Sequence, residues 1–232
     1  MRRLLCLALL LWSGVAQAGC RQALALGLDV SGSVDSREYR LQMDGLAAAL
    51  LHPEIREALL ALPDAPVALA VFEWSGPESQ MLVLDWTVII DEAALQGAAA
   101  QLRAARRHVG DPSTAIGAAL QFGAGLLAQQ PNCWKRTLDL SGDGQSNTGP
   151  HPRDLRDTTQ AAGLTVNGLV VATHGRGDRG STGIGELSAY FRAYVISGPD
   201  AFVETALGFD AFEAAMVRKL KRELQGPIFS AQ

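Results

Sequence analysis

The sequence predicts an α/β domain with three layers: a doubly wound, mostly parallel sheet of six strands with one antiparallel edge strand. Short, continuous apolar runs, typical of strands buried on both faces, alternate with segments of helical spacing. No linker or internal repeat divides these segments. The polar, glycine-rich loops follow the ends of apolar runs, and ligands bind at that edge of such sheets.

The predicted strands are apolar runs bounded by turn residues: 23–30, 66–74, 81–90, 136–140, 164–172 and 201–205. The turn cluster 75–79 joins the second and third runs and predicts a hairpin, which gives the antiparallel edge strand. The predicted helices have apolar residues at helical spacing or a high alanine content: 36–51, 91–105, 114–130, 152–162, 184–194 and 210–224. Asp35 or Ser36 is the predicted N-cap of the first helix.

Residues 1–18 have the pattern of a secretory signal peptide. Two arginines are followed by an apolar stretch and by the small-x-small sequence 16–18, too short and wrongly flanked for a membrane span. A lipoprotein anchor at Cys20 is an open alternative, although the polar Gln17 argues against it. We therefore expect one domain over residues 19–232, in a periplasmic or secreted protein.

The charge balance argues against a nucleic-acid partner. The chain has 20 basic and 24 acidic residues, a net charge of −4, and losing the two arginines of the leader takes it to −6. Nucleic-acid binding would need a basic face. After the leader, no apolar run reaches the ~18 residues of a membrane-spanning helix. We expect neither a nucleic-acid partner nor a membrane span.

Two cysteines, Cys20 and Cys133, remain after the leader. Each lies shortly before a predicted strand, so the two sulfur atoms would lie at a similar height if those strands are parallel neighbours. An exported protein then favours a disulfide over two free, buried thiols.

Oxygen donors gather where the first strand ends. Asp29, Ser31 and Ser33 follow the apolar run, with Gly32 between the two serines. Oxygen ligands of this kind suit a hard divalent cation such as Mg²⁺. They also suit a helix N-cap, in which Ser and Asp accept hydrogen bonds from backbone N–H groups.

Two later segments add donors of the same kind. Thr114 begins the stretch TAIGAAL, and Asp143-Gly144 follows a later strand. Together with Asp29-x-Ser31-x-Ser33, this set resembles the von Willebrand factor type A (VWA) domain and its metal-ion-dependent adhesion site (MIDAS). Further stretches, EWSGP, LDWT, SGDGQSNTGP and SGPDAFV, resemble a bacterial exported subfamily of unknown function.

The resemblance implies a metal-dependent binding protein and no catalysis. Asp29, Ser31, Ser33, Thr114 and Asp143 would hold Mg²⁺, with Mn²⁺ or Ca²⁺ as substitutes. An Asp or Glu carboxylate of a partner protein would fill the open coordination position. Related domains also suggest the hypothesis that ligand binding moves the last helix.

Weaker signals surround this set. Glu73 and Trp74 end a strand at the same edge and could line the ligand rim, although a tryptophan there is as often part of the core. The basic cluster Arg103, Arg106, Arg107 and His108 could meet an acidic partner, but a solvated helix end explains it better. The tripeptide 176–178, Arg-Gly-Asp, is best explained by chance.

The alternative function is a magnesium-dependent phosphohydrolase of the haloacid dehalogenase type. Asp29 would accept the phosphoryl group and Asp143 would bind the metal. Such an enzyme needs a carboxylate where this chain has Ser31, and a lysine between the two motifs, whereas no lysine precedes Lys135. Phosphoryl transfer depends on positive charge near the transferred group. The histidines also lack metal-ligand spacing. The sequence therefore favours binding over catalysis.

Overall fold

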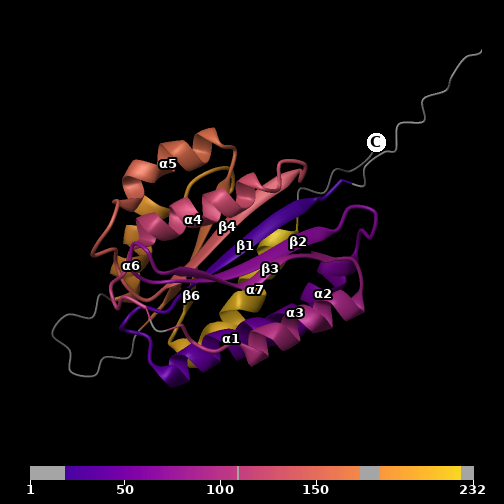
Figure 1. The fold of residues 1–232 in the computed structure, drawn as a ribbon, viewed down its shortest axis with the longest axis horizontal. Helices are drawn as coiled ribbons and strands as arrows, with labels where there is room; N and C mark the ends of the chain where they lie inside the picture. Colours follow the sequence, from indigo (N-terminus) through magenta and orange to yellow (C-terminus); the bar gives the residue numbers. More distant parts are fainter. Residues whose placement is uncertain (1–18, 109, 173–182, 226–232) are drawn as a thin grey trace, which may run out of the picture.

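The computed structural model describes residues 19–108, 110–172 and 183–225, and a six-stranded sheet lies at its centre. The strand order is β3-β2-β1-β4-β5-β6 (Figure 1). β3 runs antiparallel to β2 at one edge, and all other neighbours are parallel. The strands are β1 Gln22–Asp29, β2 Val67–Trp74, β3 Gln80–Ile89, β4 Lys135–Gly142, β5 Thr165–Val171 and β6 Val203–Ala206. The predicted fold class is confirmed.

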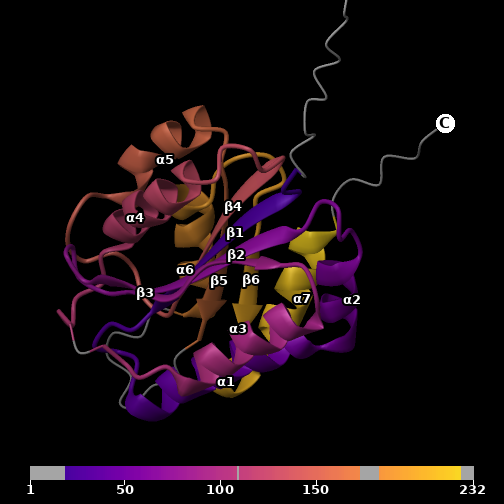
Figure 2. The ribbon, with the colours of Figure 1, turned by 45° about the vertical axis from the view of Figure 1, so that its right-hand side comes forward.

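Helices cover both faces of the sheet. α1, α2, α3 and α7 lie on one face, and α4, α5 and α6 lie on the other (Figures 1 and 2). The helices are α1 Ser36–Leu51, α2 Pro53–Leu60, α3 Glu92–Ala104, α4 Ile116–Ala128, α5 Pro152–Ala161, α6 Ile184–Tyr190 and α7 Phe212–Leu224. A short π-helix, Phe191–Val195, continues α6, and a 3₁₀ turn, Phe209–Ala211, precedes α7.

The sheet separates two hydrophobic cores, and β1 contributes to both. Leu24, Leu26 and Leu28 pack in the core beneath α1 and α7, whereas Ala23 and Ala25 pack in the core beneath α4. Burying each leucine stabilises the fold by roughly 1.5–3 kcal/mol. Because both faces of β1 are covered, its sequence is a continuous apolar run without alternation.

The structure differs from the predicted elements mainly in short segments. The helix α2 was not predicted, although it begins with a proline at its first position and buries Ile55 and Leu59 one turn apart. β6 begins two residues later than predicted, and the last helix begins at Phe212 because a 3₁₀ turn takes up its predicted first residues. Short elements give few apolar positions from which a period can be recognised.

A disulfide joins Cys20 and Cys133, as predicted. The two residues precede β1 and β4, which are adjacent parallel strands, and the Trp134 amide donates to the Cys20 carbonyl oxygen at 2.9 Å. The bridge closes a loop of 113 residues. In the chain-entropy model, closing such a loop stabilises the fold by about 4–5 kcal/mol.

Some predictions lie outside the described residues. They are the leader 1–18 and the tripeptide 176–178 within the predicted loop. Within the described ranges, the helices are all too short or too polar to cross a membrane.

Candidate metal centre

The candidate site lies where β1 and β4 end side by side. β1 ends at Asp29, and Asp143 follows the last residue of β4. β1 has β4 on one side and β2 on the other, and β4 has β5 on its far side. The connections that follow β1 and β4 in the chain therefore run to opposite sides of the sheet. In open α/β sheets, ligands bind in the crevice at this point. The fold therefore brings together two aspartates that are more than 100 residues apart in the sequence.

Hydrogen bonds link the first loop to Asp143. The Ser31 amide donates to Asp29 Oδ1 at 2.8 Å, and the Ser33 hydroxyl donates to Asp143 Oδ1 at 2.7 Å. The hydroxyl oxygens of Ser31 and Ser33 lie 3.2 Å apart. Gly32 allows a close approach to the next loop, since a Cβ atom there would lie 3.0 Å from Pro112 Cβ. Four predicted site residues thus meet in one small cluster.

The two aspartates carry charge that is not compensated within the cluster. Asp29 is 1 % exposed and Asp143 is 8 % exposed. Burial and the nearby charge of Asp143 raise the pKa of Asp29 to about 7, and burial also raises the pKa of Asp143. The Oδ2 atoms of both residues are buried and have no hydrogen-bond partner among the described residues. Two such oxygens beside two hydroxyl groups fit a bound cation.

Thr114 borders the same cluster and is held by the loop after β4. Its amide donates to Asn147 Oδ1 at 2.9 Å, and its carbonyl oxygen accepts the Asn147 amide at 2.9 Å. The Thr114 hydroxyl lies 4.0 Å from the position of a Cβ atom at Gly144, the residue after Asp143. All five predicted metal-site residues therefore lie at one edge of the sheet.

Other residues than the predicted metal ligands cap the helices that follow them. Asp35 is the N-cap of α1 and accepts hydrogen bonds from the amides of Arg37 and Glu38 in a capping box. At α4, the Ser146 hydroxyl accepts the Ile116 amide at 3.2 Å, whereas the N-cap residue makes no side-chain cap. The hydroxyl groups of Ser33 and Thr114 are thus not used as caps.

Comparison with known proteins assigns the family. A family model described as "Protein of unknown function (DUF1194)" matches residues 19–228. The chain belongs to the DUF1194 family. A comparison with curated proteins found no match.

Solved structures show that this DUF1194 protein has the VWA fold. Proximal thread matrix protein 1 from the mussel byssus matches with a TM-score of 0.59 and 16% identity, over 90% of this chain and 47% of the mussel chain. The pilus adhesin SpaC from Lactobacillus rhamnosus GG, in its open conformation, matches with a TM-score of 0.62 and 14% identity, over 88% of this chain and 30% of the adhesin.

A von Willebrand factor type A protein from Catenulispora acidiphila matches with a TM-score of 0.53 and 14% identity, over 88% of this chain and 42% of that chain. Another structure of the mussel protein is described as having a zinc-occupied MIDAS motif. The DUF1194 chain thus spans less than half the length of these proteins, and at such identities the similarity shows the fold alone.

The sequence did not single out several residues that hold the site of the DUF1194 protein. Asn147 and Ser146 lie in the quoted SGDGQSNTGP stretch, but only the tertiary structure shows that they hold Thr114. Gln42 donates to the Asp29 carbonyl oxygen at 2.9 Å and is buried. A glutamine on the apolar face of α1, next to Met43, is the one signal that could have pointed to it.

Glu73 and Trp74 are buried, at 2 % and 0 % exposure. Trp74 lies in the core with α4, which is the packing alternative considered for it. Glu73 Oε1 accepts the Tyr39 hydroxyl at 2.6 Å, and Oε2 accepts the His108 amide at 3.1 Å. Both side chains therefore lie beneath the surface at which we had expected a ligand rim.

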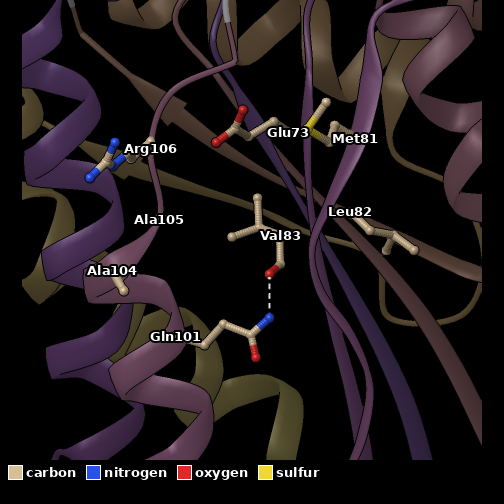
Figure 3. Close-up of a pocket in the computed structure, with 8 residues that line it drawn as sticks. All are labelled: Glu73, Met81, Leu82, Val83, Gln101, Ala104, Ala105 and Arg106. Carbon is tan, nitrogen blue, oxygen red and sulfur yellow. Dashed lines mark hydrogen bonds between the residues drawn. The ribbon is translucent and has the colours of Figure 1, made fainter.

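A cavity of about 280 Å³ lies between β3 and the end of α3 (Figure 3). Glu73, Met81 and Leu82 line it, and Gln101 Nε2 donates to the Val83 carbonyl oxygen across it at 2.8 Å. None of the five predicted metal-site residues lines this cavity. In the part of the chain that the structure describes, no three His, Cys, Asp or Glu side chains gather as a metal site. A metal at the sheet edge would therefore need the hydroxyl groups as well as the two carboxylates.

Proposed function

We propose that this protein binds a divalent cation through Asp29, Ser31, Ser33, Thr114 and Asp143, and binds an acidic side chain of a partner protein through that cation. The observation that supports the proposal is the pair of buried carboxylate oxygens, Oδ2 of Asp29 and of Asp143, without hydrogen-bond partners among the described residues. Burying anionic oxygens without a partner is costly, and a cation removes that cost.

The donor chemistry favours Mg²⁺, with Mn²⁺ or Ca²⁺ as possible substitutes. Carboxylate and hydroxyl oxygens suit hard cations, and Mg²⁺ prefers six oxygens while readily keeping water ligands. The five proposed ligands include no histidine or cysteine. The bound ion would act as a Lewis acid that attracts an anionic ligand. An Asp or Glu carboxylate of the partner would supply that ligand.

We propose binding rather than catalysis. A phosphohydrolase with Asp29 as its nucleophile would need a lysine to neutralise the phosphoryl group. The chain has three lysines, and each one bonds elsewhere. Lys135 donates to the Glu223 carbonyl oxygen, Lys219 pairs with Asp139 and Glu223, and Lys221 pairs with Glu54.

We further propose that the protein acts outside the cytoplasm, in the periplasm or after secretion. The disulfide supports this location, because disulfides persist in oxidising compartments. The family match begins at residue 19, directly after the predicted leader.

Titration calorimetry of Mg²⁺ and Mn²⁺ into the chelator-treated chain tests metal binding. We expect one site per molecule, lost in Asp29→Ala and in Asp143→Ala. Asp35→Ala is a matched control, because this aspartate belongs to the same loop but caps α1. It should lower stability by about 1 kcal/mol and leave metal binding unchanged. Absence of binding at millimolar metal with acetate present would refute the metal site.

The acidic partner is tested with a pair of peptides. Immobilised peptides that differ only in one Glu or Gln residue should differ in binding when Mg²⁺ or Mn²⁺ is present and should be equal when a chelator is added. Equal binding of both peptides in the presence of metal would contradict coordination of a carboxylate while leaving the metal site intact.

A further inference from the structure

Arg107 lies beside the first metal loop, although it is not one of the predicted ligands. Its Nη2 atom donates to the carbonyl oxygen of Val30 at 2.8 Å and to that of Ser31 at 3.0 Å. The side chain is partly buried. Two hydrogen bonds from one guanidinium group to consecutive carbonyl oxygens restrict both the position and the direction of the backbone between Asp29 and Ser33.

The backbone next to Arg107 is itself held in place. Glu73 Oε2 accepts the His108 amide, and its other carboxylate oxygen accepts the Tyr39 hydroxyl. Glu73 is 2 % exposed and belongs to β2, so it fixes this backbone to the sheet. Farther along the same connection, the Pro112 carbonyl oxygen accepts the Gly32 amide at 2.8 Å. The connection after α3 thus touches the first metal loop at two points.

We propose that Arg107 is a positioning residue of the metal centre, which holds the loop carrying Asp29, Ser31 and Ser33 in the geometry that binds the cation. The inference rests on the proposed function and adds an outer layer to it, in which Glu73 holds the segment that carries Arg107. Outer partners of metal ligands typically change metal affinity by about 10–100-fold when they are removed. The basic cluster that looked like a solvated helix end therefore contains one arginine with a specific role.

The sign of the effect separates positioning from simple electrostatics. A positive charge near the site repels a divalent cation, so removing that charge alone would strengthen cation binding. Removing a positioning group instead weakens binding, because the loop loses the backbone bonds that fix it. Arg107→Ala therefore gives opposite results under the two explanations.

Calorimetric titration of Mn²⁺ into the wild type, Arg107→Ala, Arg107→Lys and Arg106→Ala tests the proposal. Arg106 is a matched control, because it is exposed and its side chain points away from Glu73 (Figure 3). We expect binding to weaken about tenfold or more in Arg107→Ala and to change less than about twofold in Arg106→Ala. Arg107→Lys keeps the charge, but its side chain is shorter, so Nζ cannot occupy the position of Nη2 and the variant should also bind more weakly than the wild type. Unchanged or tighter binding by Arg107→Ala, or full affinity in Arg107→Lys, would overturn the proposal.

A second measurement does not depend on metal. Amide hydrogen exchange in the chelator-treated chain should become faster at Ser31 and Gly32 in Arg107→Ala, while strands β4 and β5 stay as protected as in the wild type. Equal exchange at these two amides would overturn the positioning role. If the wild type bound no metal, the proposed function would fail, and the exchange result alone would decide whether Arg107 holds the loop.

Discussion

Replacing Lys219 with methionine should destabilise the protein by about 3–5 kcal/mol, because it removes the ammonium group that pairs with two buried carboxylates between α7 and the sheet. Lys219 Nζ lies 2.6 Å from Asp139 Oδ2 on β4 and 2.7 Å from Glu223 Oε1 on α7. The side chains of all three residues are at most 2 % exposed. Asn167 Nδ2 also donates to Glu223 Oε1, at 2.6 Å.

The magnitude follows from the cost of keeping these carboxyl groups buried. Burial raises the pKa of Asp139 to about 7 even with Lys219 beside it. Burial alone would lower the pKa of Lys219, but the charges of Asp139 and Glu223 raise it above its usual value. Without the ammonium group, at least one carboxyl must take up a proton in the folded state. Removing one partner of a buried ion pair typically costs about 3–5 kcal/mol, because the remaining charge stays buried without a counter-charge.

Urea unfolding followed by circular dichroism, with the disulfide intact, measures the change. Lys221→Met is the matched control on the same helix, because Lys221 pairs with Glu54 at the surface and should contribute little. Adding Asp139→Asn to Lys219→Met should recover part of the lost stability. A loss of less than about 1 kcal/mol in Lys219→Met would refute the reasoning, since it would mean that water or a structural change stabilises the two carboxylates without the lysine.

Three further predictions concern the candidate metal site and the other buried carboxylate, Asp139. Burial raises the pKa of both Asp29 and Asp139 to about 7, so between about pH 4 and pH 7 the folded chain binds more protons than the unfolded chain. The free energy of unfolding of the metal-free protein should therefore fall as the pH rises through this window and level off above it. Because a cation displaces the proton from Asp29, Mn²⁺ should raise the melting temperature more at about pH 8 than at about pH 5, and an equal rise at both would contradict this linkage. Asn147→Ala should weaken Mn²⁺ binding about tenfold, because the Thr114 amide loses its hydrogen-bond acceptor. Asn147→Asp keeps an acceptor oxygen at this position and should bind Mn²⁺ nearly as well as the wild type. Equal loss of binding in both variants would contradict the role of that hydrogen bond.

The sequence predicted the layers because they depend on local patterns, and the order of the elements predicted that the candidate site residues would lie at one edge of the sheet. The apolar run of β1 follows from burial on both faces, and Asp29, Ser31 and Ser33 lie at its end. In a parallel sheet the ends of β1 and β4 share one edge, so the approach of Asp143 to Asp29 also followed from the order of the elements.

The sequence could not predict contacts between distant polar side chains. Arg107 looked like part of a solvated helix end, because nothing local shows that its guanidinium group reaches the Val30 carbonyl oxygen. The buried contact of Lys219 with Asp139 joins residues that are 80 positions apart, and its lysine lies in a helix rich in charged residues. The movement of the last helix stays a hypothesis. Such a movement would have to break or carry along this buried contact.

The disulfide and the candidate metal centre lie at opposite ends of the same pair of strands. Cys20 and Cys133 bond just before β1 and β4, and Asp29 and Asp143 lie where these strands end. The covalent bond therefore prevents β1 and β4 from sliding past each other, and any relative movement must become a splaying about the bonded end. The two neighbouring carboxylates at the far end therefore cannot separate by a shift in register, even without a cation between them. A cation that bound there as proposed would find both carboxylates already in place.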